Sequence, residues 1–388
     1  MMQLEAIQEE LLTRGIDAWL FCDHHHRDPI AYRVLGLPES TMVSRRWFYL
    51  IPAKGDPVRL VHRIEPFHLE TLPGKQMEYA SWQQLLSSLE TVLSPYRRIA
   101  MQFSPNNLIF TVSLVDGGTI DLVRSFGKEV VSSANLVARF EATWTDEQIA
   151  SHFAARDSVD SIMKAVFPEI GRRVGGSGTS EYEIQKWLME CFNREKLVSD
   201  SPPIVAVNQN SSNPHYAPTA DRFSPIAVGD FILLDVWAKK QSPSAVYYDI
   251  SWTGFVGTEV PERIRDIFEI VRRSRDAGIA KAQEIGSGAK ICGWEVDKAA
   301  RGVIEAAGYG RYFNNRTGHS IGTEVHGNGA NMDNFELRDE RELIPNTCFS
   351  VEPGIYLPEF GLRSEINMLV REKSAEITGL VQQSVVII

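Results

Sequence analysis

The sequence predicts an α/β domain followed by a larger α+β domain that carries an internal duplication. Helix-like and strand-like segments alternate up to about Glu141. At Thr145 this alternation gives way to the pattern of a long amphipathic helix. In the second part, the order helix, histidine and two carboxylate-bearing strands occurs twice. Because a domain is typically about 100 to 200 residues long, a chain of 388 residues is expected to form two.

The composition is that of an ordinary globular protein. Hydrophobic residues make up 43% of the chain and charged residues 23%, with no biased tract that would indicate disorder. Acidic residues outnumber basic ones by 50 to 40, and the basic residues are scattered. A nucleic-acid-binding surface is therefore not expected.

The sequence predicts a cytoplasmic protein. The stretch MMQLEAIQEELLTRG lacks the apolar centre of a signal peptide, and no later run is apolar for long enough to cross a bilayer. The four cysteines have no paired spacing, and we expect them to be reduced and mostly buried. They are Cys22, Cys191, Cys292 and Cys348.

The first predicted domain covers residues 1–141. An amphipathic helix runs to about Arg14, and the strand AWLFC follows it. Two apolar runs then flank Gly55, Asp56 and Pro57, which is a typical hairpin signal. The segments RRIAMQF and GTIDLVRSF continue the alternation of elements.

The second predicted domain covers residues 142–388. Thr145, with Gln148 three positions later, is a capping-box signature for a long helix. No linker rich in glycine, serine or proline precedes this helix, so we expect closely docked domains.

The duplication in the second domain repeats a histidine and two carboxylates after a helix. In the first half, TSEYEIQKWLMECFNRE precedes His215, Asp235 in DFILLDVWA and Asp249 in YYDISWTGFVG. In the second half, ICGWEVDKAARGVIEAAGYG leads to RTGHSIGTEVHG, CFSVEPGIYL and LRSEINMLV. These three segments carry His319 and His326, Glu352, and Glu365. The carboxylates are 14 residues apart in the first half and 13 in the second, as in neighbouring strands of a hairpin.

These carboxylates indicate a metal centre. Asp235 ends the apolar run FILLD, which is typical of a strand covered on both faces. An unpaired carboxylate there would cost several kcal/mol or take up a proton. Four converging carboxylates would repel one another unless cations bridged them. With His319 they form a hard, oxygen-rich set that favours two divalent ions, Mn, Fe, Co or Zn.

Taken singly, the same residues have simpler interpretations. One aspartate at a strand end is more often a turn or capping residue, and one histidine is more often part of the core or the surface. The joint pattern of five candidates in two parallel halves is what favours the metal centre.

The second domain resembles the pita-bread metallohydrolases, the family of methionine aminopeptidase, aminopeptidase P, prolidase and creatinase. The family's ligand order Asp, Asp, His, Glu, Glu matches Asp235, Asp249, His319, Glu352 and Glu365, and TGHSIG, VEPGIY and LRSEINMLV are typical pieces. Residues 1–141 resemble the amino-terminal domain of the creatinase, prolidase and aminopeptidase P branch.

The resemblance implies a mechanism. Asp249 and Glu365 would bridge two metal ions, Asp235 would bind one and His319 the other, and the water between the ions would attack a carbonyl. Glu352 would be a ligand and also carry a proton to the leaving nitrogen. His215 and His326 match histidines that contact substrate and stabilise the tetrahedral intermediate; alternatively, they are surface-loop residues beside Pro214 and Gly327.

Arg363 occupies a place where the family often has arginine. It precedes Glu365 by two positions, so strand alternation predicts that both lie on one face, where the guanidinium orients a ligand carboxylate.

Three departures from the family pattern concern the surroundings of the metals. Trp237 stands at a glycine position, and the connection that follows is about three residues longer than usual by the resemblance. Ser251 replaces the usual threonine, and VHGNGANMDN lacks an acidic neighbour after His326. We therefore expect a remodelled substrate rim that includes Trp237.

The resemblance implies a metal-dependent exopeptidase acting on short peptides, with Xaa-Pro bonds as the expected substrate and manganese as the expected metal. Two alternatives stay open: a hydrolase or lyase of the same fold that acts on a non-peptide small molecule, and a non-catalytic binding protein. The family also implies a homodimer.

The stretch FCDHHHRDPI contains three consecutive histidines and raises the question of a second metal site. Neighbouring side chains of an extended segment point to opposite sides, so at most His24 and His26 could converge. We expect a loop tip rather than a metal centre. In related dimers this loop reaches the neighbouring subunit, so His24 and His26 are predicted to line a substrate rim there.

Overall fold

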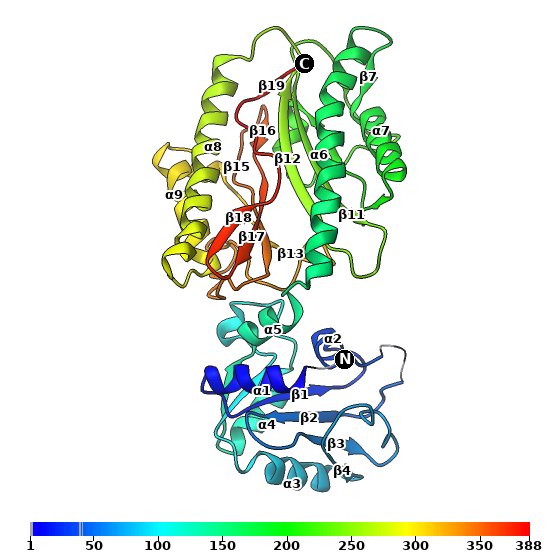
Figure 1. The fold of residues 1–388 in the computed structure, drawn as a ribbon, viewed down its shortest axis with the longest axis vertical. Coiled ribbons are helices and arrows are strands. Elements are labelled where there is room, and N and C mark those ends of the chain that lie inside the picture. The colour runs from blue at the N-terminus through cyan, green and yellow to red at the C-terminus, as the bar shows by residue number, and fades with distance from the viewer. Residues whose placement is uncertain (1–2, 39, 41) are drawn as a thin grey trace. The chain divides into compact units, whose positions relative to one another are not determined.

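The computed structural model describes residues 3–38, 40 and 42–388, and Figure 1 shows its course. The chain divides into two compact units, Met1–Glu141 and Ala142–Ile388. Among the described residues, none of the helices has the length and apolar character needed to cross a membrane.

Unit 1 is built on a six-stranded sheet in the order β4-β3-β2-β1-β5-β6. The neighbours of β2 are antiparallel to it, whereas the remaining pairs are parallel. The strands are β1 (Ala18–Asp23), β2 (Trp47–Pro52), β3 (Val58–His62), β4 (Lys75–Tyr79), β5 (Arg98–Met101) and β6 (Glu129–Ser132). The helices are α1 (Leu4–Thr13), α2 (Pro29–Leu35), α3 (Trp82–Leu93), η1 (Pro105–Asn107), α4 (Gly117–Ser125) and α5 (Ala134–Glu141).

The sheet of unit 1 is covered on both faces. Trp19 and Phe21 of β1 belong to one hydrophobic cluster, and Leu20 belongs to another. Since alternate residues of a strand point to opposite faces, one cluster lies on each side of the sheet. The predicted hairpin is confirmed: β2 and β3 are antiparallel, and Gly55 in their turn has φ +99°, which suits glycine.

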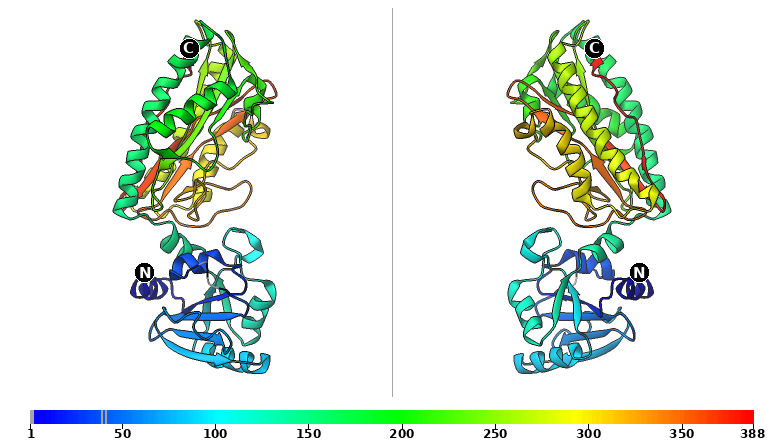
Figure 2. Two further views of the ribbon diagram at one scale, coloured as in Figure 1. Left: turned by 90° about the vertical axis from the view of Figure 1, so that its right-hand side faces the viewer. Right: turned by 90° about the vertical axis from the view of Figure 1, so that its left-hand side faces the viewer.

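Unit 2 combines long helices with short and long strands. The predicted capping box is confirmed, with Thr145 and Gln148 capping α6. The helices are α6 (Asp146–Val174), α7 (Glu181–Arg194), η2 (Asn208–Ser212), α8 (Glu262–Gln283), η3 (Glu284–Ser287), α9 (Gly293–Ala306) and η4 (Gly310–Tyr312). Figure 2 shows α6 and α8 running along the length of this unit.

The strands of unit 2 form sheets in the two halves of the predicted duplication. The first half holds β7 (Thr179–Ser180), β8 (Leu197–Val198), β9 (Ile204–Val207), β10 (Pro225–Ile226), β11 (Phe231–Lys240) and β12 (Tyr248–Phe255). The second holds β13 (Ser320–Ile321), β14 (Cys348–Val351), β15 (Gly354–Tyr356), β16 (Gly361–Arg363), β17 (Ile366–Arg371) and β18 (Ser374–Ile377). The last strand, β19 (Val386–Ile387), returns to the first half and pairs with β12.

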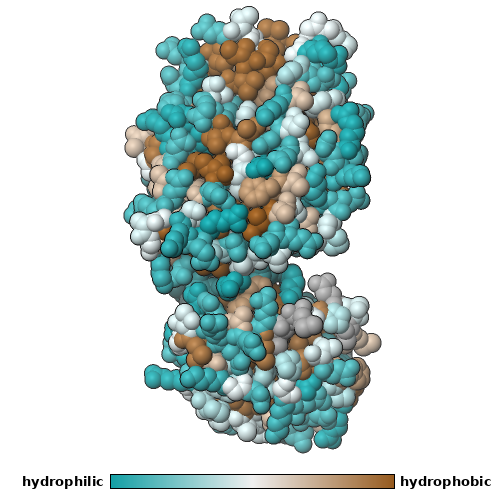
Figure 3. Space-filling model, viewed as in Figure 1, coloured by the Kyte–Doolittle hydropathy of each residue, from teal (hydrophilic) through white to brown (hydrophobic). Residues whose placement is uncertain are grey.

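Each half contains the same antiparallel arrangement of three strands. In the first, β11 lies between β9 and β12, and in the second, β14 lies between β13 and β17. On the face in Figure 3, apolar groups follow the strands between α6 and α8, while hydrophilic groups cover the helices.

A side-chain amide joins the two halves. Asn367 on β17 accepts a hydrogen bond from the Asp249 backbone N–H (2.9 Å) and donates one to the Asp249 carbonyl (2.7 Å). The N–H of Glu365 also donates to the carbonyl of Ser251 (3.3 Å). These bonds bring the carboxylate-bearing ends of β12 and β17 together.

Candidate metal centre

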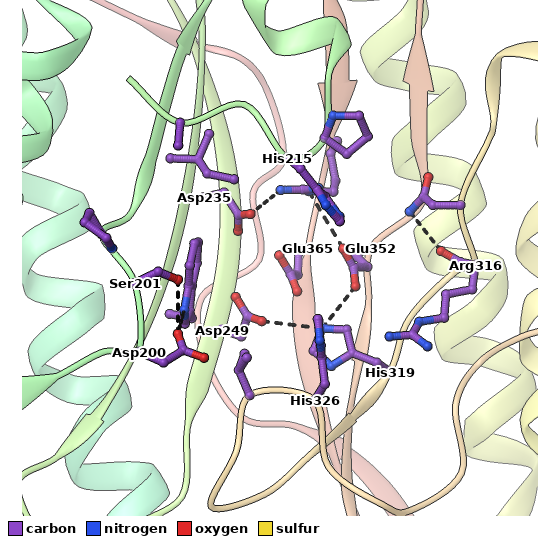
Figure 4. A pocket seen from close by; sticks show the side chains of 18 of the residues that line it. Asp200, Ser201, His215, Asp235, Asp249, Arg316, His319, His326, Glu352 and Glu365 are labelled. Atoms are coloured by element: carbon purple, nitrogen blue, oxygen red, sulfur yellow. Dashed lines mark hydrogen bonds and ion pairs between the residues drawn. The ribbon is translucent and has the colours of Figure 1, made fainter. Parts of the chain in front are cut away.

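The predicted ligands of both halves meet in a cavity of about 510 Å³ within unit 2 (Figure 4). Its walls come from β11, β12, the segment before β13 and the ends of β14 and β16, together with several loops. Its lining residues include Asp235, Asp249, His319, Glu352 and Glu365, as well as His215, His326, Trp237 and Arg363.

Strand register places the two aspartates. On the β11–β12 ladder, Asp235 is opposite Ser251 and Trp237 is opposite Asp249. Since side chains two apart share a face, all four lie on the same side of the sheet. Asp235 is 9% exposed and Asp249 is 5% exposed, so both carboxylates are buried.

The second half supplies the remaining ligands in a similar way. Glu352 follows β14 directly and Glu365 precedes β17, and the pair Val351 and Ile366 sets them opposite each other. The carbonyl of His319 accepts from the Ser350 N–H (2.9 Å), and the Ser350 hydroxyl accepts from the His319 N–H (3.0 Å). The pairing of β13 with β14 therefore fixes the backbone of His319, and with it the position of the imidazole in the cavity.

The side chains approach within ligand-sharing distances. His319 Nε2 lies 3.3 Å from Glu352 Oε1 and 3.5 Å from Asp249 Oδ2. Asp249, His319 and Glu365 each offer a ligand atom within 4.8 Å of the others, and no other such group was found in the described part of the chain.

Electrostatics make this cluster unfavourable unless positive charge compensates it. Burial raises the pKa of Asp249 and of Glu365 well above the usual range, and repulsion between these two neighbouring carboxylates adds to the shift of Glu365. Burial also raises the pKa of Asp235 and lowers that of His319. Neutral imidazole is the form that binds a metal ion.

Unsatisfied hydrogen-bonding atoms point to the same conclusion. Among the described residues, Asp249 Oδ1 and Glu365 Oε1 are buried without a hydrogen-bond partner. Ser251 Oγ lies 2.9 Å from Asp235 Oδ1 and 2.7 Å from Glu365 Oε2, yet its single proton serves only one of them. The donor set therefore fits divalent cations, which would satisfy these oxygens and relieve the repulsion.

Arg363 contacts the cluster, but the strand argument for its position is wrong. Its guanidinium pairs with Asp235 and donates through Nε to Ser251 Oγ (2.8 Å). However, Arg363 ends β16, which pairs with β15 in a separate sheet, and Glu365 lies beyond that strand. A break at Ser364, rather than one continuous strand face, directs both side chains to the cavity.

The predicted flanking residues line the cavity walls. The His326 ring stands edge-on to His319, with 4.3 Å between ring centroids. Burial, followed by the neighbouring His319, lowers the pKa of His326 to about 4, so its imidazole is neutral at pH 7. His215 lies on another wall, and Trp237 donates from Nε1 to Asp200 Oδ1 (2.7 Å).

His24 and His26 belong to unit 1, and the loop is not extended as the sequence argument assumed. His25 and His26 have φ of +61° and +55°, and the rings of His24 and His25 are 4.1 Å apart. The turn forms because the Asp23 carboxylate accepts backbone N–H groups from residues 26–28. None of these histidines joins a candidate metal group in the described chain.

Several residues of the site were missed by sequence reasoning. Asp200 and Arg316 line the cavity, Ser350 donates to Glu352 Oε1 (3.1 Å), and Asn367 holds β12 against β17. Ser350 stands two positions before Glu352 on a strand, so alternation could have indicated it. Asp200 and Arg316 lie in irregular segments, which carry no periodic signal.

A duplicated half-barrel with a buried centre of four carboxylates and one histidine is the architecture of the pita-bread metallohydrolases. The chain belongs to metallopeptidase family M24, whose model matches residues 150–372. Predicted membership of this family is thereby confirmed.

Relatives and solved structures agree with this assignment. The chain is 32% identical over 248 residues to the Xaa-Pro dipeptidase of Lactobacillus helveticus, which is 62% of this chain and 60% of that protein. It is 31% identical over 226 residues to the Xaa-Pro dipeptidase of Pyrococcus horikoshii, covering 57% and 58%. The chain thus matches about three fifths of the length of these relatives.

The fold similarity extends over nearly the whole chain. The dipeptidase PepE from Mycobacterium ulcerans superimposes with a TM-score of 0.67 at 20% identity, covering 99% of this chain and 96% of that one. The Xaa-Pro dipeptidase from Bacillus anthracis gives a TM-score of 0.62 at 21% identity, covering 99% of both. The predicted fold, with a creatinase-like first domain and a pita-bread second domain, is confirmed.

Proposed function

We propose that this protein is a metal-dependent exopeptidase that hydrolyses Xaa-Pro bonds of short peptides. The observation that carries the proposal is the set of five candidate ligand side chains that line one cavity of about 510 Å³, flanked by His215 and His326. Asp235, Asp249, His319 and Glu365 are buried, and Glu352 is half-buried. The relatives named Xaa-Pro dipeptidases support the choice of bond.

In this proposal Asp235, Asp249, His319, Glu352 and Glu365 would hold two divalent ions, manganese being the expected metal. Bound ions would supply a water of lowered pKa and a Lewis acid for the scissile carbonyl.

The protein's own groups manage protons and charge. Glu352 takes the proton of the attacking water and returns it to the leaving nitrogen, while the Ser350 hydroxyl donates a hydrogen bond to Glu352 Oε1. His326, neutral at pH 7, donates a hydrogen bond to the oxygen of the tetrahedral intermediate, and His215 contacts the substrate from the opposite wall. Arg363 fixes Asp235 and keeps one positive charge beside the four carboxylates.

The test is a hydrolysis profile of the full chain on Xaa-Pro dipeptides, Xaa-Pro tripeptides and matched Xaa-Ala peptides, with Mn, Co and Zn in turn. We expect hydrolysis of Xaa-Pro peptides that a chelator abolishes and added metal restores. Asp249→Asn should lose both bound metal and activity. Bound metal without cleavage of any of these peptides would instead favour the same-fold alternative that acts on a non-peptide small molecule, and absence of both metal and activity would favour a binding protein.

The assembly and location follow the same proposal. We infer a homodimer in the cytoplasm, on the resemblance to the creatinase and prolidase branch. Light scattering coupled to size-exclusion chromatography measures the mass, and a monomer of 43.6 kDa would contradict the dimer.

A further inference from the structure

We propose that Asp200 and Trp237 form a subsite for a positively charged side chain on the first residue of the substrate, lysine or arginine. The inference rests on the proposed function, which it extends from a bond to a class of peptide. Neither residue is a candidate metal ligand. Trp237 is the rim residue that departs from the family pattern, and Asp200 lies in an irregular segment.

The strand pairing of β11 explains why Asp200 lies at the cavity. Strand β8 pairs with Lys239 and Lys240, whereas β9 pairs with Ile232–Asp235. The residues that connect β8 to β9 therefore pass beside Trp237, where β11 has no partner on that side. Asp200 belongs to this connection and lines the cavity together with Ser201 and Pro202.

The Asp200 carboxylate is oriented by hydrogen bonds to one of its two oxygens. Its Oδ1 accepts from the Trp237 indole N–H (2.7 Å) and from the Ser201 hydroxyl (3.2 Å). Its Oδ2 has no hydrogen-bond or ion-pair partner among the described residues. Lys239, two positions after Trp237, is close enough that the charge of Asp200 acts to raise its pKa, although burial lowers that pKa overall. Its Nζ donates to the Thr323 carbonyl (2.6 Å) and lies over the Tyr247 ring.

The pair offers two kinds of attraction to a cation. A carboxylate oxygen gives a charge-assisted hydrogen bond, and the indole face gives a cation–π contact. Figure 4 shows Asp200 and Ser201 on the side of Asp249, with Arg316 on the opposite side of the cavity. The negative charge of Asp200 is therefore set apart from the positive charge of Arg316.

The chemistry of a short Xaa-Pro peptide decides which group fits. Proline carries no charge and the carboxyl terminus is negative, so a cation must come from the first residue. Its α-ammonium group is one carbon from the scissile carbonyl and must stay near the buried ligands. Asp200 is exposed at the wall, unlike the ligand carboxylates, so a long basic side chain is the group that reaches it.

The experiment compares kcat/KM of the manganese-loaded protein on Lys-Pro, Arg-Pro, Leu-Pro and Glu-Pro. We expect the wild-type ratio of Lys-Pro to Leu-Pro to fall about tenfold in Asp200→Asn, mainly through KM, and Glu-Pro to improve. Trp237→Phe, which keeps a ring but removes the N–H, should lower the same ratio by a smaller factor. Asp266→Asn, an equal charge change on the exposed surface of α8, is the matched control and should leave the ratio unchanged.

Three outcomes would overturn the subsite. An equal loss of kcat/KM on all four dipeptides would assign Asp200 to the α-ammonium group, and unchanged kcat/KM values on all four would show that it does not contact the substrate. If wild type hydrolyses no dipeptide, the proposed function fails first, and calorimetric binding of Lys-Pro and Leu-Pro decides the subsite separately. Equal binding of the two peptides to wild type and Asp200→Asn would then contradict it.

Discussion

Ser251 has one proton to share between two carboxylates and accepts a third contact from Arg363. Its hydroxyl is completely buried, so it fixes the orientation of Asp235 and Glu365. Such outer groups typically contribute about 10- to 100-fold in metal affinity. We predict that Ser251→Ala weakens metal binding by this factor in a chelator-competition titration.

Ser251→Thr is the matched control because it keeps the hydroxyl and restores the residue usual in the family. It should bind metal within a fewfold of wild type, provided the added methyl is accommodated, which thermal unfolding checks. If Ser251→Ala binds metal as tightly as wild type, the hydroxyl does not position the ligands.

His326 is the residue whose protonation state bears most directly on the proposed chemistry. Its pKa of about 4 leaves a neutral N–H donor at pH 7, beside but outside the ligand set. Removal of one donor to an oxyanion typically costs about 10²- to 10³-fold in kcat. We predict this loss for His326→Ala, measured by steady-state kinetics, with the metal content unchanged in elemental analysis. Loss of metal together with activity would instead make His326 a ligand.

At the scale of elements, His152 on α6 forms hydrogen bonds to both halves of unit 2. Its Nδ1 lies 2.7 Å from the Tyr247 carbonyl and therefore donates, so Nε2 of the neutral ring accepts from Thr378 Oγ1 at 2.8 Å. Burial lowers the pKa of His152 to about 4. Protonation would remove the acceptor and leave a buried charge.

This burial predicts a loss of stability in acid. The unfolded chain binds a proton near pH 6.5 and the folded chain only near pH 4. Stability is therefore full above pH 6.5 and is lost as the pH falls toward 4, by about 2 kcal/mol at pH 5. Urea unfolding of wild type and His152→Gln at pH 7.5 and 5 measures it. The variant should be less stable at pH 7.5 but lack this share of the pH dependence; parallel pH profiles would contradict the assignment.

Regular elements were predictable where a local physical signal marks them. Gly55 predicts the β2–β3 turn, because a turn with positive φ favours glycine over other residues. Thr145 and Gln148 predict the start of α6, because their side chains accept hydrogen bonds from N–H groups that the helix leaves unpaired. The break between Arg363 and Glu365 carries no such signal. Likewise, the turn after β1 depends on hydrogen bonds to the Asp23 carboxylate. The prediction of an extended segment at the three histidines does not take these bonds into account.

At the scale of the whole molecule, the ligand set was predictable because duplication repeats its order in the sequence. The β11–β12 register places Asp235 and Asp249 on the same buried face, and the alternation of side chains along a strand, which is visible in the sequence, indicates that face. The cavity wall could not be predicted in this way. Asp200 reaches it only because β8 and β9 pair with different parts of β11, and Asn367 matters only once the two halves meet.

In the proposed homodimer, the resemblance places the loop with His24 and His26 of one protomer at the substrate site of its partner. The double variant His24→Ala with His26→Ala should keep its metal and show a KM raised severalfold in Xaa-Pro hydrolysis. His25→Ala, in the same turn, is the matched control and should change KM less. Loss of metal in the double variant would contradict a role confined to substrate.

Subunit mixing separates action on the partner from action within one chain. The double variant has an intact metal centre but a defective loop, whereas Asp249→Asn has an intact loop and a defective centre. A mixed dimer would combine the working centre of one protomer with the working loop of the other, so a fraction of sites should recover the wild-type KM. If mixing restores nothing although mixed dimers form, the loop serves its own chain or no substrate site at all.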